Sequence, residues 1–184
     1  MFDGYRAIFW GLFFISFHFN LGDFQILPNF IGWAMILSGI GKLQNTYPSD
    51  KFSKAARLAL IAVIYSVISL VFTFSDQFQD NFSPFMVILL LFIDTVELLM
   101  EYYLLSGSAE HLCDNNNPDM AEGLIMQLRV YLIVYFANII FLCVSLTLFL
   151  NSWAVAVAVI GMILRICYMA MISKLKHLNQ EETV

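Results

Sequence analysis

The stretch at residues 83–113, SPFMVILLLFIDTVELLMEYYLLSGSAEHLC, decides the fold of this chain. It is apolar enough to lie in lipid, yet it carries Asp94, Glu97 and Glu101 inside the apolar run. A charged side chain at the centre of a membrane helix costs about 2.5 to 3.5 kcal/mol on insertion scales. At about 100° per residue, the three positions fall within about 60° of one another on a helix. We therefore expect a membrane helix whose acidic face points into a bundle.

The composition of the whole chain also indicates a membrane protein. Of the 184 residues, 60% are hydrophobic and 12% are charged, and the mean hydropathy is +0.78. An average soluble domain has roughly 25% charged residues. The net charge of −5 argues against nucleic acid as a partner and against a strongly basic surface for anionic lipid. Because Cys113, Cys143 and Cys167 form no CxxC pair, we expect neither a disulfide framework nor a thiolate metal site.

Six apolar runs predict an all-α bundle of six transmembrane helices, in a single domain over residues 1–184. The expected spans are about 5–20, 28–44, 57–75, 84–104, 129–150 and 153–173. A bilayer core about 30 Å thick needs close to 20 helical residues, so the first two spans are short. Either the linker at residues 20–30 dips into the membrane or the bilayer thins there. Residues 44–57 are expected to form a polar linker.

The fourth helix is expected to continue beyond the membrane to residue 113. Asn117 and Pro118 have the residue types of a helix cap and a first helical position, so they predict the start of the fifth helix. Lys and Arg residues fall on one side of the six-span scheme, and the three loops on the other side contain none. Since cytoplasmic loops are enriched in these residues, we expect both termini in the cytoplasm, below a plasma membrane.

The segment before the second span carries a distinctive pattern. Residues 24–33 read FQILPNFIGW and follow Asp23. Pro28 suits a helix start, and the Asn29 side chain can satisfy free N–H groups in the first turn. Together with Gly32, these residues predict an extracytoplasmic turn that opens the second helix. We interpret the motif as a folding element rather than a ligand site.

This pattern resembles F-x-I-L-P-[DN]-F-I-G-[YW], which opens the second helix in a group of small, uncharacterised integral membrane proteins of Gram-positive bacteria. The match covers about a fifth of the chain. The resemblance implies a bacterial membrane, and it implies no particular activity. Within the second span, Gly32 and Gly39 lie seven residues apart and predict a shallow groove for a neighbouring helix.

The acids of the fourth span need partners on other helices. Counted from the outer helix ends, Glu97 and Arg165 each lie 13 residues deep, about 20 Å along the helix axis, so they are expected to be level. Asn138 of the fifth span falls in the same layer. Closer to the cytoplasm, Arg129 is the expected second partner, for Glu101. These residues predict a buried polar cluster.

Two tyrosines extend this cluster. Tyr131 and Tyr135 share a helix face with Asn138, and we expect them to donate hydrogen bonds to the carboxylates. Asp94 has no evident basic partner at its depth. The cluster can be read as an ion-pair network that fixes helix register, or as a proton or substrate site, since carboxylates inside membranes commonly mark such pathways.

Two functions are compatible with these features. The first, which the sequence favours, is a non-enzymatic accessory or regulatory component that acts through a partner membrane protein or as a homo-oligomer. The alternative is a proton-coupled transporter of a small solute. No catalytic motif is present, so we expect neither an enzyme nor a cofactor. His111, Cys113 and Asp114 are metal-ligand types, but a tetrahedral site needs four convergent ligands and no further pair is evident, so no metal is expected.

Overall fold

The computed structural model describes residues 1–16, 20–21, 24–25, 29–73, 84–115, 117–147 and 151–181. Within these residues the expected all-α fold is confirmed. The described helices are α1 (Phe2–Ser16), α2 (Asn29–Thr46), α3 (Asp50–Thr73), α4 (Pro84–Asp114), α5 (Pro118–Thr147) and α6 (Asn151–Glu181). Between α1 and α2, the two-residue strands β1 (Asn20–Leu21) and β2 (Phe24–Gln25) pair antiparallel.

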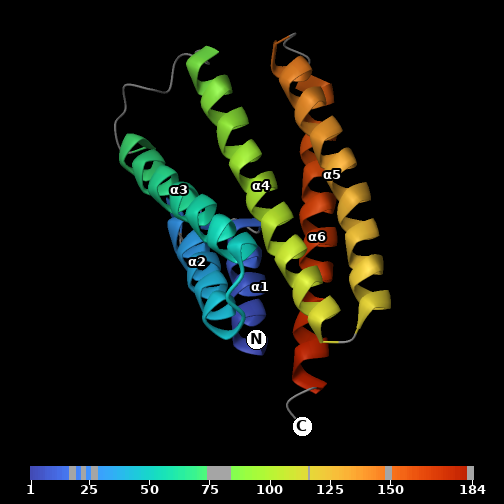
Figure 1. Ribbon diagram of the computed structural model, residues 1–184. Coiled ribbons are helices and arrows are strands. Elements are labelled where there is room, and N and C mark those ends of the chain that lie inside the picture. The colour runs from blue at the N-terminus through green and yellow to red at the C-terminus, as the bar shows by residue number, and fades with distance from the viewer. Residues whose placement is uncertain are drawn as a thin grey trace.

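The helices form a closed ring in chain order. Each helix packs against the next one in sequence, and α6 packs against α1. Figure 1 shows α1, α2 and α3 grouped on one side, α5 and α6 on the other, and α4 between the two groups. The N-terminus and the last turns of α6 lie toward the same, lower end of the view. Side chains that point into the ring from α4 can therefore meet side chains from both groups.

Three described helices contain stretches long and apolar enough to cross a membrane: Asp50–Ser69, Pro118–Ser145 and Val155–Leu178. Large apolar side chains on α5 and α6 point outward, including Ile133, which is 71% exposed, and Val155, which is 66% exposed. An outward apolar surface of this kind is expected for helices that face lipid. The fold is therefore that of a membrane protein.

The contact between α1 and α2 is made through glycines. Gly4 faces Gly39, and Gly11 faces Gly32, so the two backbones touch at two levels. A Cβ atom placed on Gly39 would lie 2.6 Å from Ile8 Cγ1 and 2.7 Å from the Gly4 carbonyl oxygen. The groove predicted from the spacing of Gly32 and Gly39 is confirmed. Its partner is α1, whose own glycines are also seven residues apart.

Several helix ends differ from the expected boundaries. The linker expected at residues 44–57 is reduced to residues 47–49, because α2 runs to Thr46 and α3 begins at Asp50. The Ser49 hydroxyl accepts a hydrogen bond from the Lys51 N–H at 3.3 Å, which satisfies a free donor in the first turn of α3. At the other end of the chain, α6 continues to Glu181, beyond the expected end at residue 173.

Two further ends bear on the predicted caps. α1 ends at Ser16, earlier than the expected residue 20. α5 begins at Pro118, as predicted, and the Asn117 carbonyl accepts the Ala121 N–H at 3.2 Å, as the residue before a helix does. Proline is tolerated at this first position because its missing N–H has no partner within the helix.

Candidate functional site

The centre of the ring contains an ion pair between α4 and α6. Arg165 Nη2 donates to Glu97 Oε2 at 2.8 Å. The Glu97 side chain is 4% exposed and the Arg165 side chain is 26% exposed, so the carboxylate is fully enclosed and the guanidinium is partly accessible. The pairing predicted from equal depth in the two helices is present. It links two helices that are not neighbours in sequence.

One turn further along α4, Glu101 is completely buried. The Tyr131 hydroxyl on α5 donates to Glu101 Oε2 at 2.6 Å, which is a short hydrogen bond of the kind expected with a carboxyl acceptor. The other oxygen, Oε1, has no hydrogen-bond partner among the described residues. Tyr168 of α6 is also fully buried, and its ring lies 5.6 Å from that of Tyr131. The predicted donor role of Tyr131 therefore has a specific acceptor.

Arg129 does not take the predicted place beside Glu101. Its side chain is exposed, and it forms no ion pair with the residues that the structure describes. The physical reason is the helix period: Arg129 and Tyr131 are two residues apart, so they point about 200° apart around α5. Because Tyr131 faces α4, Arg129 faces away from it.

A cavity of about 300 Å³, with several polar side chains in its wall, adjoins the ion pair. Asp94 lines it from α4, Tyr135 and Asn138 line it from α5, Arg165 lines it from α6, and Ser16 lines it from the end of α1. The rest of the wall is apolar or small: Ile139, Leu142, Val157, Ala158, Gly161 and Met162. The cavity thus brings together four polar side chains of the predicted cluster. It also includes a serine that was not predicted as a site residue.

The polar atoms around this cavity are incompletely satisfied. Asn138 Oδ1 and Ser16 Oγ are buried and have no hydrogen-bond partner among the described residues. The Asp94 carboxylate forms no hydrogen bond or ion pair with the described part of the chain. Tyr135 is buried against the same space, and the hydrogen bond predicted from Tyr135 to a carboxylate is not formed among these residues. Buried polar atoms without partners are costly, so a bound solute or water would satisfy them.

A further hydrogen bond, which was not predicted from the sequence, crosses the ring between α1 and α4. The Tyr5 hydroxyl of α1 donates to Ser108 Oγ of α4 at 2.8 Å, and Ser108 Oγ donates to the Leu104 carbonyl at 2.8 Å. Both side chains are buried. A tyrosine near a helix start and a serine in a long helix are common residues, so neither type indicated the contact.

A second polar cluster joins the short link between α2 and α3, and the first turn of α3, to the end of α4. Tyr47, between α2 and α3, donates a hydrogen bond to the Asp114 carboxylate at the end of α4. Ser49 Oγ donates to Glu110 Oε2 at 3.0 Å, and Lys51 Nζ lies 3.7 Å from the same oxygen. These contacts fasten the short α2–α3 link to the end of α4.

The motif expected to form an extracytoplasmic turn is described only in part. Asp23 and Pro28 lie outside the described residues. Asn29 is the first residue of α2, one residue after the expected start of the second span, and Gly32 packs against Gly11 of α1. Both described residues thus act in helix initiation and packing.

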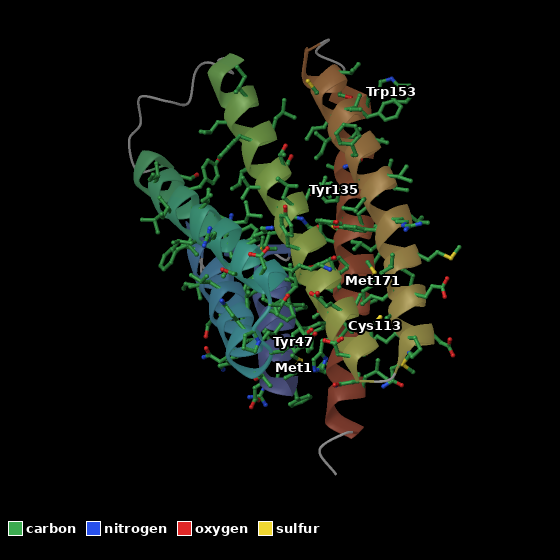
Figure 2. All side chains as sticks on the ribbon, in the orientation of Figure 1. Met1, Tyr47, Cys113, Tyr135, Trp153 and Met171 are labelled. Atoms are coloured by element: carbon green, nitrogen blue, oxygen red, sulfur yellow. The ribbon has the colours of Figure 1, made fainter. Side chains whose placement is uncertain are left out.

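Figure 2 places Tyr135 in the upper half of the bundle and Met171 lower down, with Cys113 near the lower end. The described residues contain no group of three or more His, Cys, Asp or Glu side chains that could bind a metal ion. The chemistry available at the cavity is therefore that of one carboxylate, one paired guanidinium and neutral oxygen groups, which can exchange a proton or bind a small polar solute.

In comparisons with protein-family models, curated proteins and solved structures, no match to this chain was found.

Proposed function

We propose that this protein crosses a bacterial plasma membrane six times, with both termini in the cytoplasm. The membrane character of α3, α5 and α6 supports this proposal, as does the closed ring that all the helices form. A polytopic bundle in which α4 is enclosed by its neighbours accounts for three acids inside an apolar run, because two of the acids find partners within the ring. The Lys and Arg distribution supports the proposed orientation, because cytoplasmic loops are enriched in these residues.

The proposed function is the binding and transport of a small polar solute, coupled to a proton on Asp94. The observation that carries it is the cavity of about 300 Å³, in which Asp94 has no ion-pair partner among the described residues. Solute sites in membrane carriers lie within the bilayer and combine polar groups with an ionisable residue. The cavity favours this function over the accessory role, because a purely structural cluster has no need of a hollow beside it.

Transport can be tested in proteoliposomes with an imposed pH gradient. Solute uptake that depends on the gradient and is abolished by Asp94→Asn is the expected result. The matched control is Asp119→Asn, which removes an exposed acid from the first turn of α5, far along the chain from the cavity. Equal activity of the Asp94→Asn and Asp119→Asn variants would show that Asp94 has no part in transport.

A second candidate is an accessory or regulatory component without transport activity, acting through a membrane-protein partner or as a homo-oligomer. This candidate is favoured because Glu97 is paired with Arg165, and Glu101 accepts a hydrogen bond from Tyr131. Such contacts can serve only to fix how helices pack. Co-purification of a fixed partner from the native membrane, together with an absence of uptake in proteoliposomes, would support this candidate.

A further inference from the structure

We propose that the solute bound in the cavity is a small monovalent cation, either an inorganic ion or a small organic ammonium, and that it competes with a proton for Asp94. This inference rests on the proposed solute-binding role of the cavity and specifies the class of solute.

The first argument is the balance of charge. Arg165 and Asp94 both line the cavity, so at first sight it has one charge of each sign. The guanidinium, however, is paired with Glu97 at 2.8 Å, and this pair is neutral as a unit. Ionised Asp94 therefore leaves the cavity and its immediate wall with one negative charge. A cation neutralises this charge, whereas an anion or a zwitterion leaves the wall unbalanced.

The groups that face Asp94 from other helices do not alter this balance. Arg165 faces it from α6, and Tyr135 from α5 and Tyr65 from α3 are close enough to interact with its charge. Glu97, on the same helix as Asp94, is the nearest like charge and is already paired with Arg165. Both tyrosines are neutral when protonated, so among the described residues that line the cavity the Asp94 carboxylate is the group that can accept a mobile positive charge.

The second argument is the chemistry of the lining. Asn138 Oδ1 and Ser16 Oγ are buried oxygen atoms without a partner among the described residues, and the Asp94 carboxylate supplies two more oxygens. Oxygen groups are the ligands that hard cations prefer, and they also accept hydrogen bonds from an ammonium group. Asp94, Asn138 and Ser16 therefore offer acceptor oxygens in a wall that is otherwise largely apolar, which suits a ligand that brings positive charge or donors.

The exchange of a proton for a cation on the Asp94 carboxylate conserves charge and needs no further reactant. When a cation binds to protonated Asp94, the proton leaves its oxygen for water, and the charge of the cavity is unchanged. When the cation leaves toward the opposite side, a proton rebinds to the same oxygen. One cation is thus exchanged for one proton, and the pH gradient of the membrane can drive the exchange.

The test measures proton release and thermal stability of the purified protein in weakly buffered detergent solution. Sodium chloride, potassium chloride and methylammonium chloride are titrated in separate series, and glycine is titrated as a zwitterion. At least one cation is expected to release protons and to raise the melting temperature in a saturable manner for the unmodified protein and for Asp119→Asn. Asp94→Asn is expected to lose the proton release and to bind that cation at least about tenfold more weakly.

A second variant guards against failure of Asp94→Asn to fold. A Cβ atom on Gly161 would lie 3.4 Å from Asn138 Nδ2, an ordinary contact, so Gly161→Val fills part of the cavity without removing a charged group. It is expected to weaken cation binding as well, with Gly123→Val on the open side of α5 as the control, since nothing lies within 4 Å of a Cβ there.

The outcomes separate the two proposals. Binding of glycine that requires Asp94, with no response to any cation, would overturn the cation inference and leave a solute-binding cavity. A cation response that is unchanged in both Asp94→Asn and Gly161→Val would place the ion elsewhere and also overturn the inference. If no solute of either class binds and no uptake occurs in proteoliposomes, the proposed function is wrong together with it.

Discussion

Arg165 on α6 and Glu97 on α4 form an ion pair across the interior of the ring, with Nη2 and Oε2 2.8 Å apart. The guanidinium does not deprotonate in proteins, so a buried Arg165 side chain needs a partner of opposite charge. The pair therefore fixes how far α6 can slide along α4, and it places the Arg165 side chain in the wall of the cavity that Asp94 lines. The stability of the fold is expected to depend on the Arg165 guanidinium through its ion pair, and solute binding through its place in the cavity wall.

The first prediction is a double-mutant cycle on this pair. Arg165→Leu and Glu97→Leu are each expected to lower the free energy of unfolding by about 3 to 5 kcal/mol, because each leaves a buried charge without its partner. The double variant is expected to recover much of that loss. Melting temperatures in detergent measure the coupling. Arg129→Leu is the matched control, and it should change little because Arg129 is exposed. Additive losses in the cycle would contradict the pairing.

The second prediction concerns the bond between Tyr131 and Glu101. Tyr131→Phe keeps the ring but removes the hydroxyl that donates to Glu101 at 2.6 Å, so a buried carboxyl loses its partner. The expected loss of stability is about 1 to 3 kcal/mol. Tyr102→Phe, at an exposed position on α4, is the control and should have almost no effect. The two variants are compared by thermal unfolding, and equal melting temperatures would mean that the hydroxyl contributes nothing.

The residues on α5 show how far the sequence can specify such a site. Depth along a helix follows from counting residues, and this is why Glu97 and Arg165 could be paired in advance. Rotation about the helix axis does not follow from depth. Arg129 is the expected partner of Glu101, and Tyr131 is expected to donate to one of the carboxylates of the same cluster. Their spacing of two residues allows only one of them to face Glu101, and the structure has Tyr131 there.

The glycine contact and the cavity mark the other limits. The spacing of Gly32 and Gly39 predicts a groove but does not specify which helix fills it; the equal spacing of Gly4 and Gly11 in α1 matches the contact that the structure shows. The cavity beside Asp94 was not predicted, because a hollow depends on how side chains from several helices fail to fill a space. Sequence patterns describe one helix at a time, so they identify the groups that line a site better than its shape.

The third prediction compares a glycine at the contact between α1 and α2 with a glycine of α2 that makes no such contact. Gly39→Ala forces a methyl group against Ile8 and the Gly4 carbonyl of α1, so we expect it to lower stability by about 1 to 3 kcal/mol. Gly41→Ala, two residues further on α2, is the matched control because nothing lies within 4 Å of a Cβ there. It should be neutral or stabilising by about 0.5 to 1 kcal/mol, since alanine favours helix. Similar melting temperatures for the two variants would rule out the tight α1–α2 contact.

The fourth prediction is a pH dependence at the link between α2 and α3. The hydrogen bond to the Asp114 carboxylate, with smaller contributions from desolvation and from the charges of Asp114 and Glu110, raises the pKa of Tyr47 from 10.0 to about 12. A raised folded-state pKa stabilises the fold below the unfolded value, and the contribution is lost as the pH rises from about 10 to 12. Asp114→Asn should lower the pKa of Tyr47 toward its ordinary value.

Tyrosinate absorbance measures this shift, with Tyr47→Phe used to identify the component that belongs to Tyr47. Asp119→Asn, which removes an exposed acid from the first turn of α5, is the control and should leave that component unchanged. If the Tyr47 component titrates at the same pH with and without the Asp114 carboxylate, the hydrogen bond does not determine its ionisation.

The last prediction tests the proposed orientation. Tyr47 is bonded to Asp114, so the link between α2 and α3 and the end of α4 must lie on the same side of the membrane. Lys51 and Lys54 follow that link, and they are the reason that the proposed orientation has this side in the cytoplasm. Cys113, the residue before Asp114, is exposed and can report on it once Cys143 and Cys167 are replaced by serine.

A maleimide that does not cross membranes should leave Cys113 unlabelled in intact cells and should label it in inverted vesicles. Trp153→Cys, in a background without the native cysteines, provides the reciprocal control, because Trp153 is exposed near the start of α6 and lies at the opposite end of the bundle from Cys113 (Figure 2). It should be labelled from outside intact cells. Labelling of Cys113 in intact cells would reverse the orientation, and labelling of both positions from one side would rule out the six-span arrangement, since α5 and α6 would then have to re-enter rather than cross.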